Sequence, residues 1–103
     1  MSDHVEIQIT CGSVAEADRI ADALVERRYA ACVQQLPIRS TYRWDGVVQH
    51  DDEILLLVKT RAARFDDVAA TVRELHSYDV PAITAVPIVA ESRDYRAWID
   101  AET

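Results

Sequence analysis

Apolar side chains alternate with polar ones across residues 5–11, which is the period of a half-buried strand. Ser13 and Glu16 then have the spacing of a capping box, in which the serine hydroxyl accepts from the Glu16 amide and the carboxylate reaches back. An apolar stripe at helical spacing follows, made of Val14, Ala17, Ala21, Leu24 and Val25. The start of the chain therefore predicts a strand followed by a helix.

The middle of the chain predicts two strands joined by a long hairpin arm. Residues 31–36 form a strand pattern, and Pro37 predicts a bulge or an edge position that interrupts it. Asp45-Gly46 between two strand-like runs favours a type I′ turn, which needs positive φ at both central residues. The flanks of this turn are aromatic and too polar to be core, so we expect the arm to pack against something else. Residues 54–58 are uniformly apolar, as in a central strand covered on both faces.

A second helix is predicted over residues 61–76, ended by a turn before Pro81. Residues 83–89 predict a further strand, at an edge because of Pro87, and a short helix begins at Ser92. This order predicts one α+β domain over residues 1–103, a ferredoxin-like plait (βαββαβ plus a C-terminal helix) with helices on one sheet face. The other face would expose more apolar surface than monomers usually do, so we expect a homo-oligomer.

Composition narrows the possible functions. Half of the 103 residues are apolar and the net charge is −7, which supports one packed core and disfavours a nucleic-acid partner. Two cysteines without close spacing make no disulfide framework, and no stretch resembles a signal peptide or membrane span. We therefore expect a cytoplasmic protein without a membrane partner. With only two glycines and no recognisable catalytic motif, the sequence indicates no enzyme class.

Candidate metal chemistry centres on His76, at the end of the second predicted helix. An imidazole there could bind a borderline divalent ion through a free ring nitrogen, with the thiolate of Cys11 or Cys32 as a second ligand. The alternatives are a histidine favoured by the helix dipole and, for Cys32, a small core residue. The acidic run His50–Glu53 could collect cations loosely, or be a solvated shoulder of the hairpin.

Two further groups of residues could bind a ligand or a neighbouring chain. Tyr42 and Trp44 share one face of their strand, where they could line a pocket or, as we favour, pack on another subunit. Lys59, near Tyr78 and Asp79, could meet a small anion in a cleft between subunits. The alternative for Lys59 is a strand end that leads into a helix cap.

Several runs of residues are specific in combination. The first two are Tyr42-Arg43-Trp44-Asp45-Gly46 and Leu75-His76-Ser77-Tyr78-Asp79-Val80-Pro81; shorter ones are Thr10-Cys11, Ala30-Ala31-Cys32-Val33 and the run from Glu53 to Thr60. By these residues the chain, from about Ile7 to Trp98, resembles the CutA family of divalent-cation tolerance proteins. The resemblance implies a tight homotrimer of ferredoxin-like subunits whose arms reach across to neighbours. It also implies a non-enzymatic protein that binds a divalent metal, Cu(II) being the candidate, in metal tolerance.

The chain departs from the pattern of this family at several positions. Where the family usually has Cys-Pro-Asp, this chain has Cys11-Gly12-Ser13, and where the family has His-Pro-Tyr-Glu, it has His76-Ser77-Tyr78-Asp79. The Glu usual after Val-Pro is Ala82 here, and the Lys that often follows Trp-Glu-Gly is Val47. Some of these changes remove or shorten acidic side chains near the expected ligands, so we expect weak, reversible metal binding. The alternative function is a trimeric scaffold or signalling protein whose inter-subunit clefts bind a small ligand or a protein partner. An acylphosphatase-type enzyme would need a glycine-rich anion loop, which is absent.

Overall fold

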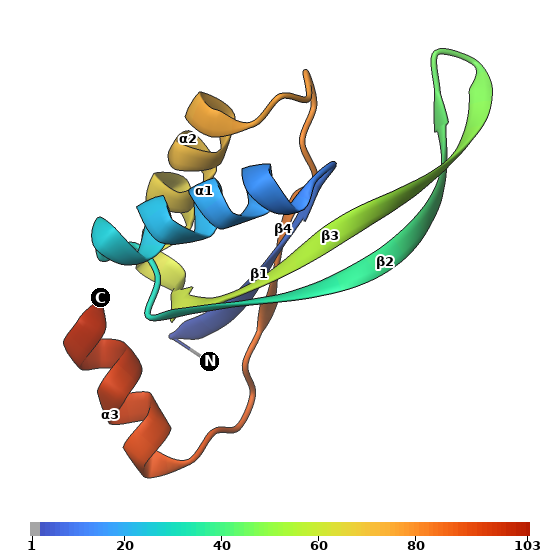
Figure 1. The fold of residues 1–103 in the computed structure, drawn as a ribbon. Coiled ribbons are helices and arrows are strands. Elements are labelled where there is room, and N and C mark those ends of the chain that lie inside the picture. Colours follow the sequence, from blue (N-terminus) through green and yellow to red (C-terminus); the bar gives the residue numbers. More distant parts are fainter. Residues whose placement is uncertain (1–2) are drawn as a thin grey trace.

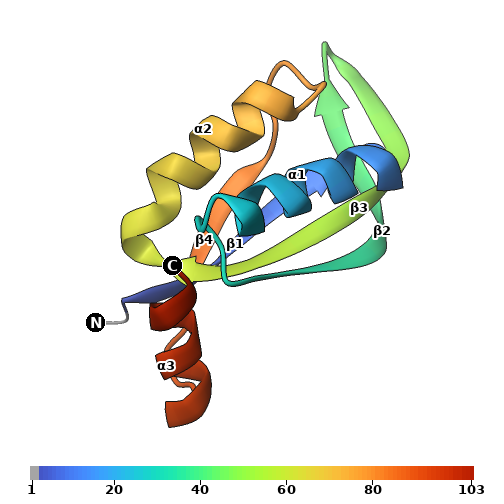
Figure 2. The ribbon, with the colours of Figure 1, turned by 60° about the vertical axis from the view of Figure 1, so that its left-hand side comes forward.

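Alternating strands and helices build the molecule, which is described over residues 3–103 by a computed structural model. The elements are β1 (His4–Cys11), α1 (Val14–Glu26), β2 (Cys32–Trp44), β3 (Val47–Arg61), the 3₁₀ turn η1 (Ala62–Arg64), α2 (Phe65–Leu75), β4 (Ile83–Pro87) and α3 (Arg93–Glu102). Helices α1 and α2 lie side by side on one face of the sheet, and α3 stands apart near the N-terminus (Figures 1 and 2). No helix among residues 3–103 is long and apolar enough to cross a membrane.

The sheet has the strand order β2-β3-β1-β4, and every neighbouring pair is antiparallel. This is the ferredoxin-like arrangement expected from the two βαβ halves, so the predicted fold class is confirmed. The core lies between the sheet and the two helices, because the alternating side chains of β1 and β3 meet the helical stripes there. Its fully buried members include Ile7, Ile9, Ile20, Leu24, Leu56, Val58, Val68 and Val72.

The hairpin between β2 and β3 continues beyond the sheet as an arm, visible in green at the upper right of Figure 1. Cys11 of β1 pairs with Ile54, so the pairs from Ile38–Glu53 to Trp44–Val47 have no β1 neighbour. We call residues 38–53 the arm. Asp45 and Gly46 have φ values of 51° and 77°, as the predicted type I′ turn requires.

Three predicted element bounds are wrong. Strand β2 continues to Trp44 instead of ending at residue 36. The edge position predicted as one option for Pro37 is confirmed, but proline is tolerated there and the pairing with Ile54 is not interrupted. The predicted helix over residues 61–76 is shorter, since β3 extends to Arg61, η1 follows, and α2 ends at Leu75. Strand β4 ends at Pro87 rather than at residue 89.

The second face of the sheet is open within one chain, as expected for helices on one face only, so within the chain residues 54–58 are covered on one face. Leu56 and Val58 are buried under the helices, whereas Leu55 and Leu57 alternate to the open side and are only half-buried. Leu36, Ile38 and Val86 belong to the same face by register, together with polar residues such as Gln8 and Gln34. The open face is therefore a mixed surface with an apolar centre.

Helix α3 is attached through a buried histidine at the start of β1. The ring of His4 lies 2.7 Å (Nε2) from the carboxylate of Asp100 in α3 and 2.6 Å (Nδ1) from that of Glu91. The hydrogen bond from His4 lowers the pKa of Asp100 below its ordinary value. The buried His4 ring at the start of β1 thus holds the last helix by hydrogen bonding.

Candidate functional site

Three side chains with metal-ligating atoms converge where β1 ends beneath the two helices. Cys11 is the last residue of β1, Glu16 lies in the first turn of α1, and His76 follows α2. The thiol sulfur, one carboxylate oxygen and one ring nitrogen all lie within 4.8 Å of one another, and no other such group occurs within residues 3–103. The structure thus brings together two of the predicted ligands, His76 and Cys11, and adds Glu16. We call these three residues the buried triad.

Both ring nitrogens of His76 are already engaged within the chain. Its backbone is extended (φ −82°, ψ 142°) after the helix, and its side chain is fully buried. Nε2 donates to the carbonyl oxygen of Thr10 at 2.7 Å, and Nδ1 accepts the amide hydrogen of Tyr78 at 3.0 Å. Because a carbonyl can only accept and an amide N–H can only donate, the proton is on Nε2. The prediction of a free ring nitrogen is therefore wrong.

Glu16 has a different role from the one that its spacing predicts. The Ser13 hydroxyl accepts from the Glu16 amide at 3.2 Å, so one half of the capping box forms. The carboxylate, however, reaches to the segment after α2 instead of back to Ser13. Its two oxygens accept the Ser77 amide hydrogen at 2.8 Å and the Ser77 hydroxyl at 3.2 Å. Glu16 therefore fastens α1 to the turn that holds His76.

The Cys11 thiol is protonated at neutral pH. Burial, and to a smaller extent the charges of Glu16 and Glu53, raise its pKa to about 11. A thiol in this state is a poor nucleophile and a poor ligand until a cation displaces the proton. Metal binding at Cys11 must therefore be accompanied by release of this proton, which weakens the binding.

The donor set of the buried triad fits a borderline divalent metal. Sulfur, imidazole nitrogen and carboxylate oxygen are ligands that zinc and copper accept. A metal-binding histidine usually donates its second N–H to a backbone carbonyl, as Nε2 does to Thr10. Nδ1 lies 3.8 Å from the Glu16 carboxylate and so faces the triad. Three protein ligands leave a fourth position open.

Cys32 and Lys59 lie away from the triad, at the other end of the sheet. The two residues pair across β2 and β3, and Lys59 forms an ion pair with Glu6 on the open face. That ion pair and its hydrogen bond lower the pKa of Glu6. Six residues separate Glu53 from Lys59 along β3, about 20 Å. Within one chain Lys59 therefore does not join Tyr78, because its register places it opposite Glu6.

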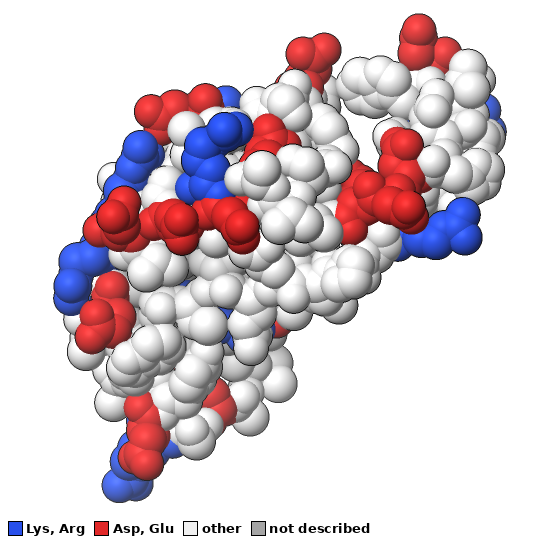
Figure 3. Space-filling model, viewed as in Figure 1, with Lys and Arg blue, Asp and Glu red and all other residues white. Residues whose placement is uncertain are grey.

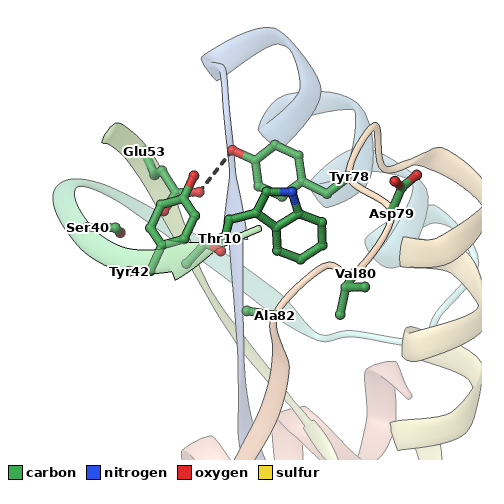
Figure 4. A pocket seen from close by; sticks show the side chains of 9 residues that line it. Thr10, Ser40, Tyr42, Glu53, Tyr78, Asp79, Val80 and Ala82 are labelled. Atoms are coloured by element: carbon green, nitrogen blue, oxygen red, sulfur yellow. Dashed lines mark hydrogen bonds between the residues drawn. The ribbon is translucent and has the colours of Figure 1, made fainter. Parts of the chain in front are cut away.

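A cavity of about 470 Å³ lies under the arm, beside the triad (Figure 4). It is lined by Thr10, Ser40, Tyr42, Trp44, Glu53, Tyr78, Asp79, Val80 and Ala82. Strand β1, the arm and the segment after α2 each contribute to its wall. The cavity thus unites the predicted ligand residues Tyr78 and Asp79 with the predicted interface residues Tyr42 and Trp44. We call it the arm cavity.

Tyr78 links the triad to the arm cavity. Its hydroxyl donates to Glu53 at 2.9 Å, as Figure 4 shows, while its amide donates to His76. Burial and the Glu53 carboxylate raise the pKa of the Tyr78 phenol well above its ordinary value. Tyr42 donates in the same way to Asp51, which raises its pKa too. The run 50–53 is therefore not a uniformly solvated shoulder, since Glu53 is buried.

Gly12 is required where Tyr78 passes over the end of β1. A Cβ at this position would lie 2.9 Å from the Tyr78 hydroxyl oxygen. We expect Gly12→Ala to displace the phenol from Glu53 and to lower the free energy of unfolding by about 1–3 kcal/mol. Urea unfolding of the single variant measures this loss. In a Tyr78→Phe background the same glycine replacement should cost clearly less; an equal cost would show that the hydroxyl is not the obstacle.

Comparison with known proteins gives a consistent picture over nearly the whole chain. The chain is 41% identical over 97 residues to the divalent-cation tolerance protein CutA of Archaeoglobus fulgidus, and 46% identical over 98 residues to that of Thermus thermophilus. In both cases the alignment covers 94% of this chain and 95% of the relative.

Solved structures agree with this sequence comparison. The structure of the periplasmic divalent cation tolerance protein CutA from Archaeoglobus fulgidus is similar with a TM-score of 0.94 at 40% identity, covering 96% of this chain and 97% of the other. The Cut A1 protein of Thermus thermophilus also gives 0.94, at 44% identity and 97% and 98% coverage. Residues 5–102 match the family described as CutA1 divalent ion tolerance protein, and the chain belongs to this family.

Proposed function

We propose that the protein is a non-enzymatic homotrimer, each chain a single domain over residues 1–103, that binds a divalent metal ion, Cu(II) being the candidate. The observation that carries this proposal is the convergence of the Cys11 thiol, the Glu16 carboxylate and the His76 ring within 4.8 Å. The family name, divalent ion tolerance protein, supports the same class of ligand. Cys32 is not part of the proposed site.

Binding requires a local exchange of partners in the buried triad. The hydrogen bond from the Tyr78 amide to Nδ1 of His76 breaks, which frees this nitrogen for the metal. The hydrogen bond from Nε2 to the Thr10 carbonyl remains and keeps the ring in its orientation. Cys11 releases its proton, and Glu16 supplies an oxygen that now accepts from Ser77. Because these existing bonds must be broken and one coordination position stays open, we expect weak and reversible binding.

Calorimetric titration of Cu(II) into the wild-type protein and into Cys11→Ser and His76→Ala tests this site. We expect each replacement to weaken binding by about tenfold or more, because each removes one of three ligands. Since the thiol must lose a proton and its pKa is about 11, the affinity should fall about tenfold for each unit of decreasing pH.

Cys32→Ser is the matched control for the titration, because it removes the other free thiol and leaves the triad intact. Its affinity for Cu(II) should equal that of the wild type. Equal affinity in His76→Ala and the wild type would remove His76 from the site. A loss in Cys32→Ser as large as in Cys11→Ser would contradict the assignment of the thiol.

A trimeric scaffold or signalling protein that binds a small ligand or a protein partner is the second candidate. The arm cavity supports it, because Tyr42 and Trp44 line a space beside Tyr78 and Asp79. We also propose that Tyr42, Trp44 and the open sheet face contact neighbouring chains, and that the two free thiols work in a reducing compartment, the cytoplasm. Native mass spectrometry with and without Cu(II) reports the subunit number and the bound ion together, and separates the two candidates.

A further inference from the structure

The two oxygens of the Glu16 carboxylate have different surroundings. Oε1 accepts the Ser77 amide hydrogen at 2.8 Å and lies 3.9 Å from the guanidinium of Arg19. Oε2 accepts the Ser77 hydroxyl at 3.2 Å and lies 3.8 Å from Nδ1 of His76, so it is the oxygen that faces the triad. A metal ion in the triad would therefore bind Oε2, and Oε1 would stay outside its coordination sphere.

Ser77 donates to both oxygens, but its two donors are not equivalent. The amide is fixed by the backbone after α2 and makes the shorter bond, whereas the hydroxyl can rotate. Arg19 adds little, because its side chain is 60% exposed and an exposed ion pair at 3.9 Å is largely screened. Glu16 itself is buried, and within residues 3–103 both hydrogen bonds to its carboxylate come from Ser77. The carboxylate is therefore held by this one residue.

The contact between Glu16 and Ser77 belongs to the helical layer, where it joins α1 to the segment after α2 (Figure 2). Neither residue is part of the open sheet face or the arm, which are the surfaces proposed to contact other chains. Acidic and basic side chains lie close together over these helices on the face shown in Figure 3, so their charges partly cancel. We therefore expect short-range contacts in the triad, rather than a long-range field, to decide the metal affinity.

We propose that Ser77 is a positioning residue that sets the metal affinity of the buried triad through Glu16, a role that rests on the metal binding proposed above. The amide holds Oε1 and so orients the carboxylate, and this bond persists when the metal is bound. The hydroxyl occupies Oε2, which the metal needs, and must be displaced. Ser77 thus supports metal binding with its backbone and opposes it with its side chain.

Replacements of residue 77 separate the two effects. Alanine keeps the amide donor and loses the hydroxyl, threonine keeps both, and proline offers neither. Proline fits at this place because the backbone of His76 before it is extended, with ψ at 142°, as a residue before proline prefers.

Calorimetric titration of Cu(II) into these variants is the test. We expect Ser77→Ala to bind about fivefold more tightly than the wild type, the effect of one competing hydrogen bond removed. Ser77→Pro should bind about tenfold more weakly than Ser77→Ala, because the carboxylate also loses the donor that orients it. Ser77→Thr, which restores the hydroxyl, should match the wild type. An affinity in Ser77→Ala that is equal to or weaker than that of the wild type would overturn the proposal.

Ser92→Ala is the matched control, because it removes a serine hydroxyl from the cap of α3, at the other end of β1 (Figure 1). Its melting temperature should fall, since the cap is lost, while its affinity for Cu(II) should equal that of the wild type. Cys11→Ser separates the two proposals. A loss of affinity in Cys11→Ser with no change in Ser77→Ala would overturn the role of Ser77 alone, whereas no loss in Cys11→Ser would overturn the metal site as well.

Hydrogen exchange of single amides, followed by NMR, gives a second readout that does not depend on affinity. Zn(II) is the probe, because it accepts the same ligands and is diamagnetic. The Ser77 amide should stay protected with and without Zn(II), because Oε1 keeps its bond. The Tyr78 amide should lose protection when Zn(II) takes Nδ1 of His76. Loss of protection at Ser77 on addition of Zn(II) would show that the metal displaces the amide, and would overturn the proposal.

Discussion

Replacement of Leu36 by aspartate is expected to convert the proposed trimer into monomers. Leu36 is 39% exposed in the single chain and lies opposite Leu55 on the open sheet face. In an isolated chain the new carboxylate stays hydrated, so it changes the free energy of unfolding little. In a contact between chains it would be desolvated without a partner, at a cost of several kcal/mol. Light scattering at micromolar concentration should give three times the 11.6 kDa chain mass for the wild type and one chain mass for the variant.

Val14→Asp is the matched control for this prediction. Val14 is also an exposed apolar residue, at 58%, but it belongs to α1 on the other side of the molecule. The mass of the Val14→Asp protein in light scattering should equal that of the wild type. A wild-type protein with the mass of one chain would refute the trimer itself, and an unchanged mass for Leu36→Asp would place Leu36 outside the subunit contacts.

Truncation of Trp44 to alanine is expected to destabilise the assembled protein by about 3–5 kcal/mol per chain, the usual cost of removing a buried aromatic side chain. In the single chain Trp44 is 50% exposed on the arm, so its own chain provides only part of the burial that such a loss requires. In the proposed trimer a neighbouring subunit supplies the rest. Thermal melting at several protein concentrations measures the loss, because the stability of an oligomer depends on concentration.

Trp98→Ala provides the comparison for this measurement. Trp98 is similarly exposed at 41%, but its ring packs on Tyr95 in the same helix, 5.6 Å between centroids. We expect a smaller loss of stability and no added dependence on concentration. Equal melting temperatures for Trp44→Ala and the wild type would show that the arm is peripheral to the assembly.

The periodic parts of the sequence predicted the fold well. Alternation over residues 5–11, the Asp45-Gly46 turn and the serine cap at residue 92 each encode their structure locally, and each element forms. The bounds of α2 were less predictable, because Arg61 fits equally well in a strand end or a helix start. Pro37 was read as an interruption, but its effect depends on whether its strand lies at an edge, which local pattern does not reveal.

The candidate site was only partly predictable, because side-chain destinations depend on tertiary packing. His76 and Cys11 were chosen by residue type, and the fold brings them together. Glu16 was missed because a capping box with Ser13 already explained its position, although its carboxylate accepts from Ser77 instead. The partner of Lys59 within the chain, Glu6, was not predicted, because it depends on the register of β3 against β1. Glu16 lies four residues before Ile20, on the apolar face of α1, and an acidic residue on such a face is the signal that could have indicated it.

The two bonds made by Tyr78 have a thermodynamic consequence. Its amide occupies the nitrogen of His76 that a metal would take, and its hydroxyl holds Glu53 in the wall of the arm cavity. Tyr78 therefore couples the proposed metal site to the arm, and a metal that takes Nδ1 of His76 would also alter the contacts proposed between the arm and neighbouring chains. Linkage requires the reverse effect to have the same magnitude. Assembly of the chains would then change the affinity for the metal by the same factor by which the metal changes the affinity between chains.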